Sequence, residues 1–494
     1  MNKVLFYSII ILLFSLGAFL KFSDNQGSIP KGCDEFGYLN LAKSFSSNNS
    51  FSYENTRPYL KELVNVLKSD SVTAFEIAVM LTPYAYFTIN DGDKVANQYP
   101  PATSYVLSLF SLGIRKKIFP AIAMFLFLII PIVFIKQFKE IVFIDLILVL
   151  LAFFITLTAP FITELNRVNS LAFTFGFLIA AGFLLKPKPL LSCFLIAITI
   201  NFRIANVLML FPLILFVDIA LFRWKDNIKK YFFTFLKYTF VVILAISPYL
   251  VYVYLLLGNP LASTYSTIDT ETTFYFLSNI KFYFYSNADW FVVHLILIVI
   301  LSLFLHYKKI DWKLFLKYLL FPLVSYLFFM FHKVQVDYYP YASSMILVGI
   351  VIHHASLLEI RWRISNKWIA IFSIVIALIS LLDGVNRYFS KEHISFEEDS
   401  FKYKVLCQYD IVWCDLLSGT TEYVCNNNGF KYDNFTLKAK KNAISFLKEK
   451  KYTQVILLND NMLSPSEVIN EVEKMNFEYE IKEDESLGQL LIIK

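Results

Sequence analysis

Long apolar runs separated by short polar stretches form the dominant pattern of the chain. A helix needs about 20 predominantly apolar residues to cross a bilayer core about 30 Å thick, and several runs have this length. Because lipid offers no partner to backbone polar groups, each run is expected to be helical. We predict membrane helices at residues 4–20, 119–135, 141–161, 168–185, 190–202, 204–222, 238–257, 291–305, 314–331, 340–358 and 367–385.

The apolar segment 101–114 is too short to be assigned by length, so its orientation is tested by the charges of the loops. If it lies along the membrane, the short loops of one face contain fifteen Lys and Arg, and Lys3 falls on the same side. An excess of basic residues marks the cytoplasmic face. The prediction is a cytoplasmic N-terminus, about eleven crossings and an external C-terminus. The opposite short loops contain only Arg167, Arg203, Lys281 and Lys333.

Three polar regions then face the external side. They are the loop 21–118, the loop 258–290 and a tail from residue 386 to residue 494. We therefore predict two domains: a polytopic α-helical membrane domain over 1–385, and a small extracytoplasmic α/β domain over 386–494.

The tail has the pattern of a small α/β domain. Its segment YTQVILLND is typical of a strand, and SPSEVINEVEKM opens with a capping box of Ser464 and Glu467, with Pro465 at the first helical position. Cysteines predicted to face the oxidising side permit disulfides, and pairing among the three cysteines of the tail is favoured. The sequence does not fix which of them pair. These cysteines are Cys33, Cys407, Cys414 and Cys425.

The composition supports a membrane protein. Hydrophobic residues make up 57% of the chain, the mean hydropathy is +0.56, and 51 Phe and 30 Tyr accompany only 14 Gly. A soluble globular domain does not have this composition. The net charge of +6 does not indicate nucleic acid, because the basic residues are sorted by membrane side. No small-x-small cleavage site follows the first apolar run, so a retained first helix is predicted.

Two adjacent carboxylates, Asp34 and Glu35, follow the first predicted crossing in the stretch DEFGYLNLAKSF. The apolar residues that recur after them at helical spacing are Tyr38, Leu41, Ala42 and Phe45. This spacing predicts a short amphipathic helix on the outer leaflet. Two interpretations of Asp34 are open: it is the N-cap of the helix, or it is a partly desolvated general base toward a hydroxyl group.

The stretch NQYPPATSYVLSLF begins the ambiguous segment. Two prolines restrict Tyr99 and start an apolar segment in which Tyr105, Leu109 and Leu112 are spaced to lie along the membrane. By itself the stretch indicates only a turn before an apolar helix. Because it follows Asp34 and Glu35 in the same predicted loop, it also belongs to an ordered set of motifs.

In this order the features resemble the GT-C glycosyltransferases, over roughly residues 1 to 260. The similar members are the protein O-mannosyltransferases, the aminoarabinose transferases acting on lipid A, and the serotype-converting O-antigen glucosyltransferases. Arg203, in ITINFRIANVLMLFPL, stands where the family often has a Lys or Arg before an apolar helix, and GNP at 258–260 resembles a later loop. The resemblance implies an enzyme that passes a sugar from a polyprenyl-phosphate carrier to an acceptor on the external face.

The second external loop departs from the family pattern. Many members carry an acidic residue there, sometimes in an Asp-x-Asp, whereas TELNRVNS offers Glu164 with Arg167 nearby and no Asp-x-Asp. We therefore predict no essential divalent metal ion and no cofactor.

The resemblance implies that cationic groups at helix ends hold the donor phosphate. Arg203, Arg167 and Lys333 are the candidates, because basic residues are few on this side. The alternative for such residues is snorkelling to lipid phosphates, except that Arg203 interrupts an apolar run, where an ionisable group usually faces a cavity or a partner. Further candidates to line the site are Glu164, Tyr99, Asp269 and His332.

The resulting hypothesis is a glycosyltransferase of a bacterial inner membrane. Asp34, with Glu35 in reserve, accepts the proton of an acceptor hydroxyl, and Arg203 stabilises the leaving lipid phosphate. The expected partners are the lipid-linked donor, membrane lipid and a glycan or lipid-glycan acceptor, with a surface polysaccharide or lipopolysaccharide O-antigen favoured over protein or lipid A. The rival hypothesis is a transporter or flippase of a lipid-linked glycan, against which the sequence shows no clear internal repeat.

Overall fold

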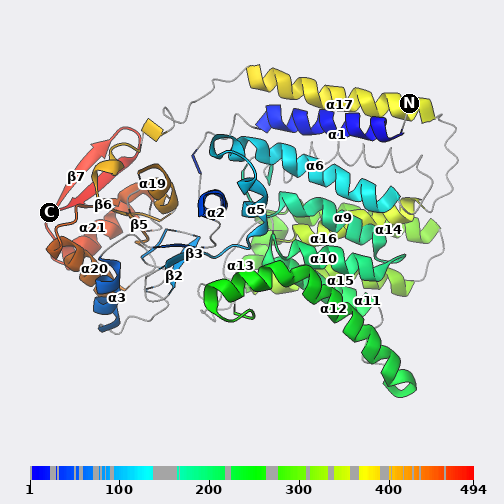
Figure 1. The fold of residues 1–494 in the computed structure, drawn as a ribbon, viewed down its shortest axis with the longest axis horizontal. Coiled ribbons are helices and arrows are strands. Elements are labelled where there is room, and N and C mark those ends of the chain that lie inside the picture. The colour runs from blue at the N-terminus through cyan, green and yellow to red at the C-terminus, as the bar shows by residue number, and fades with distance from the viewer. Residues whose placement is uncertain are drawn as a thin grey trace.

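The computed structural model describes residues 3–22, 29–30, 33–48, 52–54, 59–69, 77, 81–83, 85–89, 94–136, 164–165, 167–216, 224–262, 276–307, 312–331, 339–356, 366–389, 400–401, 403–415, 417–425, 428–432, 436–460 and 463–494. The helix predicted at 141–161 lies outside these residues. The described chain forms a bundle of apolar helices with a small α/β domain at one end (Figure 1).

Apolar helices form wherever the described chain contains a predicted membrane run. Helix α1 (Lys3–Phe22) lies beside α17 (Asn366–Phe389) and packs on α6 (Arg115–Lys136) (Figure 1). Helix α9 (Phe175–Leu184) packs against both α6 and α16 (Tyr341–Ser356). The other apolar helices are α10 (Pro189–Thr199), α11 (Leu210–Phe216), α12 (Trp224–Leu257), α14 (Asp289–Tyr307) and α15 (Trp312–Phe329).

The helices α9 and α16 approach so closely that only glycine fits between them. A methyl group at Gly182 would overlap the carbonyl oxygen of Ile346, and one at Gly349 would overlap the carbonyl oxygen of Ile179. Small residues allow such backbone approach between membrane helices, where van der Waals packing drives association.

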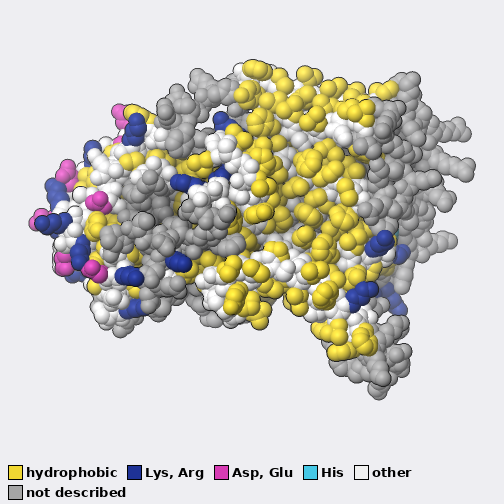
Figure 2. Space-filling view, viewed as in Figure 1, with side chains coloured by type: hydrophobic (Ala, Val, Ile, Leu, Met, Phe, Trp, Pro, Cys, Tyr) yellow, Lys and Arg dark blue, Asp and Glu magenta, His cyan; other side chains and the backbone are white. Residues whose placement is uncertain are grey.

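Four helices of the described chain are long and apolar enough to cross a membrane, and a bent pair makes a fifth. The bent pair consists of α13 and η7 (Phe276–Ser286) followed at 70° by Asp289–Leu303 of α14. Hydrophobic side chains form a broad band over the helices, and charged side chains gather on the α/β domain (Figure 2). The class of apolar helical protein is as predicted; the eleven crossings stay a prediction.

Two predicted boundaries are wrong. The helix predicted from 168 begins only at η4 (Ala172–Thr174), because a side-chain-capped loop occupies 167–171. Helix α12 begins at Trp224 rather than at residue 238. The helix continues into the residues before the apolar run, which include Lys and Asn. At 1.5 Å per residue its 34 residues are about 51 Å long, which exceeds the thickness of a bilayer core.

The predicted external loop 21–118 has its own structure. A three-stranded antiparallel sheet with order β1-β3-β2 pairs Tyr53 with Val95 and Phe87 with Ala96. In the segment 101–114 the side chains of Tyr105, Leu109 and Leu112 are exposed by 61%, 70% and 48%, as lying along a membrane requires. The elements are α2 (Cys33–Asn48), β1 (Ser52–Glu54), α3 (Leu60–Ser69), β2 (Tyr86–Ile89), β3 (Lys94–Asn97), α5 (Ala102–Ser108) and η3 (Leu112–Ile114).

The tail forms the small α/β domain that its pattern predicts. Its five-stranded sheet has the order β5-β4-β6-β8-β7, parallel across β5, β4 and β6 and antiparallel across β6, β8 and β7. The capping box of Ser464 and Glu467 is present at the start of α21. The elements are β4 (Ile411–Trp413), α19 (Ser418–Cys425), β5 (Asn428–Phe430), α20 (Leu437–Glu449), β6 (Gln454–Leu457), α21 (Pro465–Lys474), β7 (Tyr479–Asp484) and β8 (Gly488–Ile493).

Helix α3, from the segment 21–118, completes the core of this domain. Leu63 and Leu67 of α3 are buried in the same apolar cluster as Ile444 and Leu447 of α20. Tyr59 packs on Tyr452 with ring centroids 4.4 Å apart, and Lys450 pairs with Glu62. The segment 21–118 is therefore attached to the C-terminal domain through α3.

A disulfide joins Cys407 to Cys425, at the end of α19. This confirms the prediction of a disulfide among the tail cysteines. The third tail cysteine, Cys414, is buried in the sheet.

Candidate active site

Helix α2, which carries the acidic pair, is enclosed by protein. Tyr38, Leu41 and Ala42 are at most 2% exposed, and Phe45 is 9% exposed. The prediction of an amphipathic helix lying on the outer leaflet is therefore wrong. The helix contacts α5 and the three-stranded sheet β1-β3-β2 on one side and α19 on the other, so the covering residues come from distant parts of the chain.

Asp34 is held by Tyr99. The helix begins at Cys33, so Asp34 lies within its first turn rather than at the N-cap. The Tyr99 hydroxyl donates to Asp34 Oδ1 at 2.6 Å, and the Tyr99 backbone N–H donates to Asn97 Oδ1 at 2.6 Å. The segment before the two prolines thus fixes the direction of a partly buried carboxylate.

Tyr38 lies beside this pair and is 2% exposed. Its ring stacks on that of Tyr99 with centroids 4.9 Å apart, and its hydroxyl hydrogen-bonds Ser170. Burial, and next the charge of Asp34, raise the pKa of Tyr38 far above its usual range, although Ser170 and Arg203 oppose the shift. The phenol therefore stays protonated between the carboxylate and the guanidinium.

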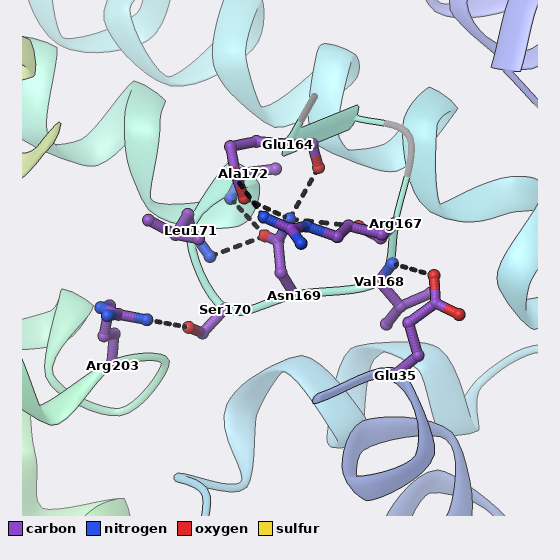
Figure 3. Close-up of polar contacts among 9 residues, drawn as sticks. All are labelled: Glu35, Glu164, Arg167, Val168, Asn169, Ser170, Leu171, Ala172 and Arg203. Carbon is purple, nitrogen blue, oxygen red and sulfur yellow. Dashed lines mark hydrogen bonds and ion pairs between the residues drawn. The ribbon is translucent and has the colours of Figure 1, made fainter. Parts of the chain in front are cut away.

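Glu35 faces away from Asp34 into a buried ion pair. Its Oε2 lies 2.8 Å from Lys116 Nζ, and its Oε1 accepts a hydrogen bond of 3.2 Å from the Val168 backbone N–H (Figure 3). Lys116 also donates to the Ile29 carbonyl oxygen at 2.7 Å. Glu35 thus ties α2 to the start of α6 and to the loop 167–171.

Asn169 organises the loop 167–171. Its Oδ1 accepts hydrogen bonds from the backbone N–H groups of Leu171 and Ala172, at 2.9 and 3.1 Å (Figure 3). Its Nδ2 donates to the Glu164 carboxylate at 2.8 Å, and Arg167 contacts the same carboxylate at 3.3 Å. Glu164 is 2% exposed, so its charge is balanced inside the protein.

Arg203 approaches the same loop from the break between α10 and η5 (Ile204–Met209). Its backbone is extended there, and Nη1 donates to Ser170 Oγ at 3.2 Å (Figure 3). The guanidinium carbon lies 5.3 Å from the ring centre of Tyr339 and 6.0 Å from that of Tyr341. Such aromatic faces favour a cation and keep the guanidinium from extending into solvent.

Asn201 sets the position of this break. Pro248 lies inside α12, and Asn201 inserts beside it: Nδ2 donates to the Ala245 carbonyl oxygen at 2.8 Å, and Oδ1 accepts from the Tyr249 N–H at 2.9 Å. The Asn201 carbonyl oxygen accepts from the Ala102 N–H at 3.1 Å. Arg203 is therefore anchored to α12 and α5 by a residue that the sequence analysis did not select.

The structure thus brings together some of the predicted site residues. Asp34, Tyr99 and Arg203 are connected through Tyr38 and Ser170, and Glu164 and Arg167 lie on the adjoining loop. Within the described ranges, no group of three His, Cys, Asp or Glu is arranged to hold a metal ion. The predicted residues outside the described ranges are Asp269, His332 and Lys333.

The fold is similar to that of two solved structures of ArnT from Cupriavidus metallidurans. For the apo state the TM-score is 0.53 at 11% identity, and for the form bound to undecaprenyl phosphate it is 0.54 at 12% identity. Each alignment covers 99% of this chain and 97% of the other. No protein-family model and no curated protein sequence matches the chain. The GT-C fold predicted from the order of motifs is confirmed.

Proposed function

We propose that the protein is a membrane glycosyltransferase that moves a sugar from a polyprenyl-phosphate carrier to an acceptor hydroxyl on the external face. The observation that supports this most is the chain of contacts that runs from Asp34 through Tyr99, Tyr38 and Ser170 to Arg203. In this proposal the carboxylate of Asp34 accepts a proton and the Arg203 guanidinium binds a phosphate, and the two belong to one connected cluster. The similar ArnT structure bound to undecaprenyl phosphate supports the class of donor.

The reaction assigned to this cluster is a single displacement. Asp34 accepts the proton of the acceptor hydroxyl, whose oxygen forms a bond to the anomeric carbon. The bond between that carbon and the phosphate oxygen breaks, and the electron pair leaves with the lipid phosphate. Arg203 stabilises the charge that develops on this phosphate, so the anomeric centre is inverted.

The other predicted residues take supporting roles in the proposal. Glu35 positions α2, because both of its oxygens are engaged in buried contacts. Arg167 is a second cation for the phosphate, and its side chain is 44% exposed beside Glu164. Tyr99 orients Asp34. The proposed roles of Lys333 in phosphate binding, and of Asp269 and His332 in lining the site, rest on the sequence.

We also propose a compartment and an acceptor for the enzyme. The chain crosses a bacterial inner membrane about eleven times, with residues 1–385 as the membrane domain and 386–494 as an extracytoplasmic domain. The acceptor is a surface polysaccharide or lipopolysaccharide O-antigen. The sorting of basic residues to one face supports the orientation, and the resemblance to O-antigen glucosyltransferases supports the acceptor class.

The test is a transfer assay with purified protein in lipid vesicles and a panel of polyprenyl-phosphate hexoses. The wild type is expected to transfer one sugar to glycan extracted from the native host, and Asp34→Asn is expected to bind that donor without turnover. Labelled donor that crosses the bilayer without transfer would favour a flippase instead. Mass spectrometry of surface glycans from cells with and without the gene identifies the sugar and the acceptor.

A further inference from the structure

The first turn of α19, in the C-terminal domain, lies against the first turn of α2. A methyl group at Gly419 would overlap the ring of Phe36, which is fully buried next to Glu35. Thr420 Oγ1 donates to the Pro30 carbonyl oxygen at 3.0 Å, and Tyr423 meets the Phe36 ring edge to face at 6.5 Å. Residues 390 positions apart in sequence therefore form one tight contact.

The opposite side of this turn of α2 is equally close to the segment that holds Asp34. A methyl group at Gly37 would come within 2.6 Å of the Tyr99 ring and 2.9 Å of Ala85 Cβ. Asn97 Nδ2 donates to the Gly37 carbonyl oxygen at 2.7 Å. The turn is thus enclosed on both sides, so a displacement of Phe36 shifts α2 against Tyr99.

The surface that α19 presents to α2 is itself fixed. The Cys407–Cys425 disulfide holds the last residue of α19, and α3 joins the core of the domain to the first external loop. A methyl group added at Gly419 therefore has this anchored helix behind it and the Phe36 ring in front of it. The ring, and α2 with it, is what gives way.

We infer that Gly419 is a positioning residue, through which the C-terminal domain sets the place of Asp34 relative to Tyr99 and Arg203. This inference rests on the proposed transferase function. The domain then acts as part of the catalytic unit, and its contact with α2 controls turnover rather than donor binding. Donor binding is assigned to Arg203, which belongs to the separate break between α10 and η5.

The kinetic test compares Gly419→Ala with wild type in the vesicle assay. We expect kcat to fall by about 10- to 100-fold, since small misplacements of a catalytic group have effects of this size, while KM for the donor stays within about twofold. Gly113→Ala is the matched control: no atom lies within 4 Å of the added methyl group, so its kcat should equal that of wild type. An unchanged kcat in Gly419→Ala would overturn the inference.

A second variant separates positioning from misfolding. Phe36→Ala removes the ring that the new methyl group meets, so Gly419→Ala combined with Phe36→Ala should turn over faster than Gly419→Ala alone. Thr420→Val removes the hydrogen bond to Pro30 without adding volume, and a smaller loss of kcat is expected from it. If Gly419→Ala lowers kcat and raises donor KM alike, and Phe36→Ala gives no rescue, the contact is only structural and the inference fails.

Hydrogen exchange gives a readout that does not depend on transfer. Backbone amides of residues 33–48 should exchange faster in Gly419→Ala than in wild type, and amides of α9 should be unchanged. If wild type shows no transfer with any donor, the proposed function fails, but this measurement still decides whether α19 holds α2. Equal exchange in both proteins would refute the contact as a positioning device.

Discussion

Glu35 and Lys116 form an ion pair of 2.8 Å in which the two side chains are 3% and 5% exposed. It joins the first turn of α2 to the first turn of α6. Because Asp34 precedes Glu35 on the same turn, this pair also fixes the direction in which Asp34 points. Two adjacent carboxylates with similar intrinsic chemistry are thereby given different environments.

Removing one member of this pair should destabilise the protein strongly. Lys116→Met leaves the Glu35 charge buried without its cation, and such a change costs about 3–5 kcal/mol. Combining it with Glu35→Gln should recover part of that loss, because no unpaired charge then remains. Thermal unfolding in detergent measures the effect, with Lys117→Met, at the less buried next position, as control. Equal unfolding temperatures for Lys116→Met and wild type would contradict the assigned role.

The bond between Tyr99 and Asp34 predicts a graded loss of turnover. Asp34→Asn removes the proposed base and should lower kcat by about 10²- to 10⁴-fold. Tyr99→Phe keeps the ring and removes only the orienting hydroxyl, so a fall of about tenfold is expected, equivalent to about 1.4 kcal/mol. Tyr105→Phe, at a side chain that is 61% exposed, is the control, and its kcat should equal that of wild type. A larger loss in Tyr99→Phe than in Asp34→Asn would point to Tyr99 as the reacting group.

Arg203 is expected to act on the donor side. Arg203→Ala should lower kcat/KM by about 10²- to 10³-fold, as removal of a transition-state donor does, and should weaken binding of polyprenyl phosphate itself. Arg203→Lys should recover little, because a lysine does not reproduce the planar donor group or its stacking on Tyr339. Arg387→Ala, at a half-exposed ion pair with Asp383, serves as control. Full activity in Arg203→Ala would remove it from the site.

Chelation should leave transfer intact. The Glu164 carboxylate contacts Asn169 and Arg167, and no three-residue metal cluster occurs within the described ranges. Transfer rates measured with and without EDTA, after removal of divalent ions, should therefore agree within about twofold. Loss of activity in chelator followed by recovery with Mn²⁺ would show that a metal ion takes part.

The apolar helices followed from the length of apolar runs, because a bilayer imposes that length on a helix. The start of α9 could not be predicted in this way. Asn169 accepts hydrogen bonds from the backbone N–H groups of Leu171 and Ala172, so the helix begins later than the apolar run does. That effect depends on a side-chain direction rather than on hydropathy. The contacts of Asn201 with α12 could not be predicted from hydropathy either, because they form only when the two segments are adjacent in the fold.

The order of motifs predicted the fold, whereas the environment of α2 could not be predicted from it. The spacing of its apolar residues predicts one lipid-facing side, but protein covers that side instead. Burial of Phe36 by Gly419 and of Tyr38 by Tyr99 depends on residues about 60 to 380 positions away. The division of roles between Asp34 and Glu35 likewise depends on Lys116, which in the sequence is one of three basic residues before an apolar helix.

The contact of α9 with α16 predicts a variant that loses stability and activity together. Gly349→Ala would press a methyl group against the Ile179 carbonyl oxygen, and overpacking of this kind costs about 1–3 kcal/mol. The two helices begin near Ser170 and Tyr341, which both contact Arg203, so separating them disturbs the donor side as well. The unfolding temperature and kcat/KM should both fall, whereas Gly113→Ala changes neither. A stable Gly349→Ala protein with normal kinetics would show that the helices adjust without moving the site.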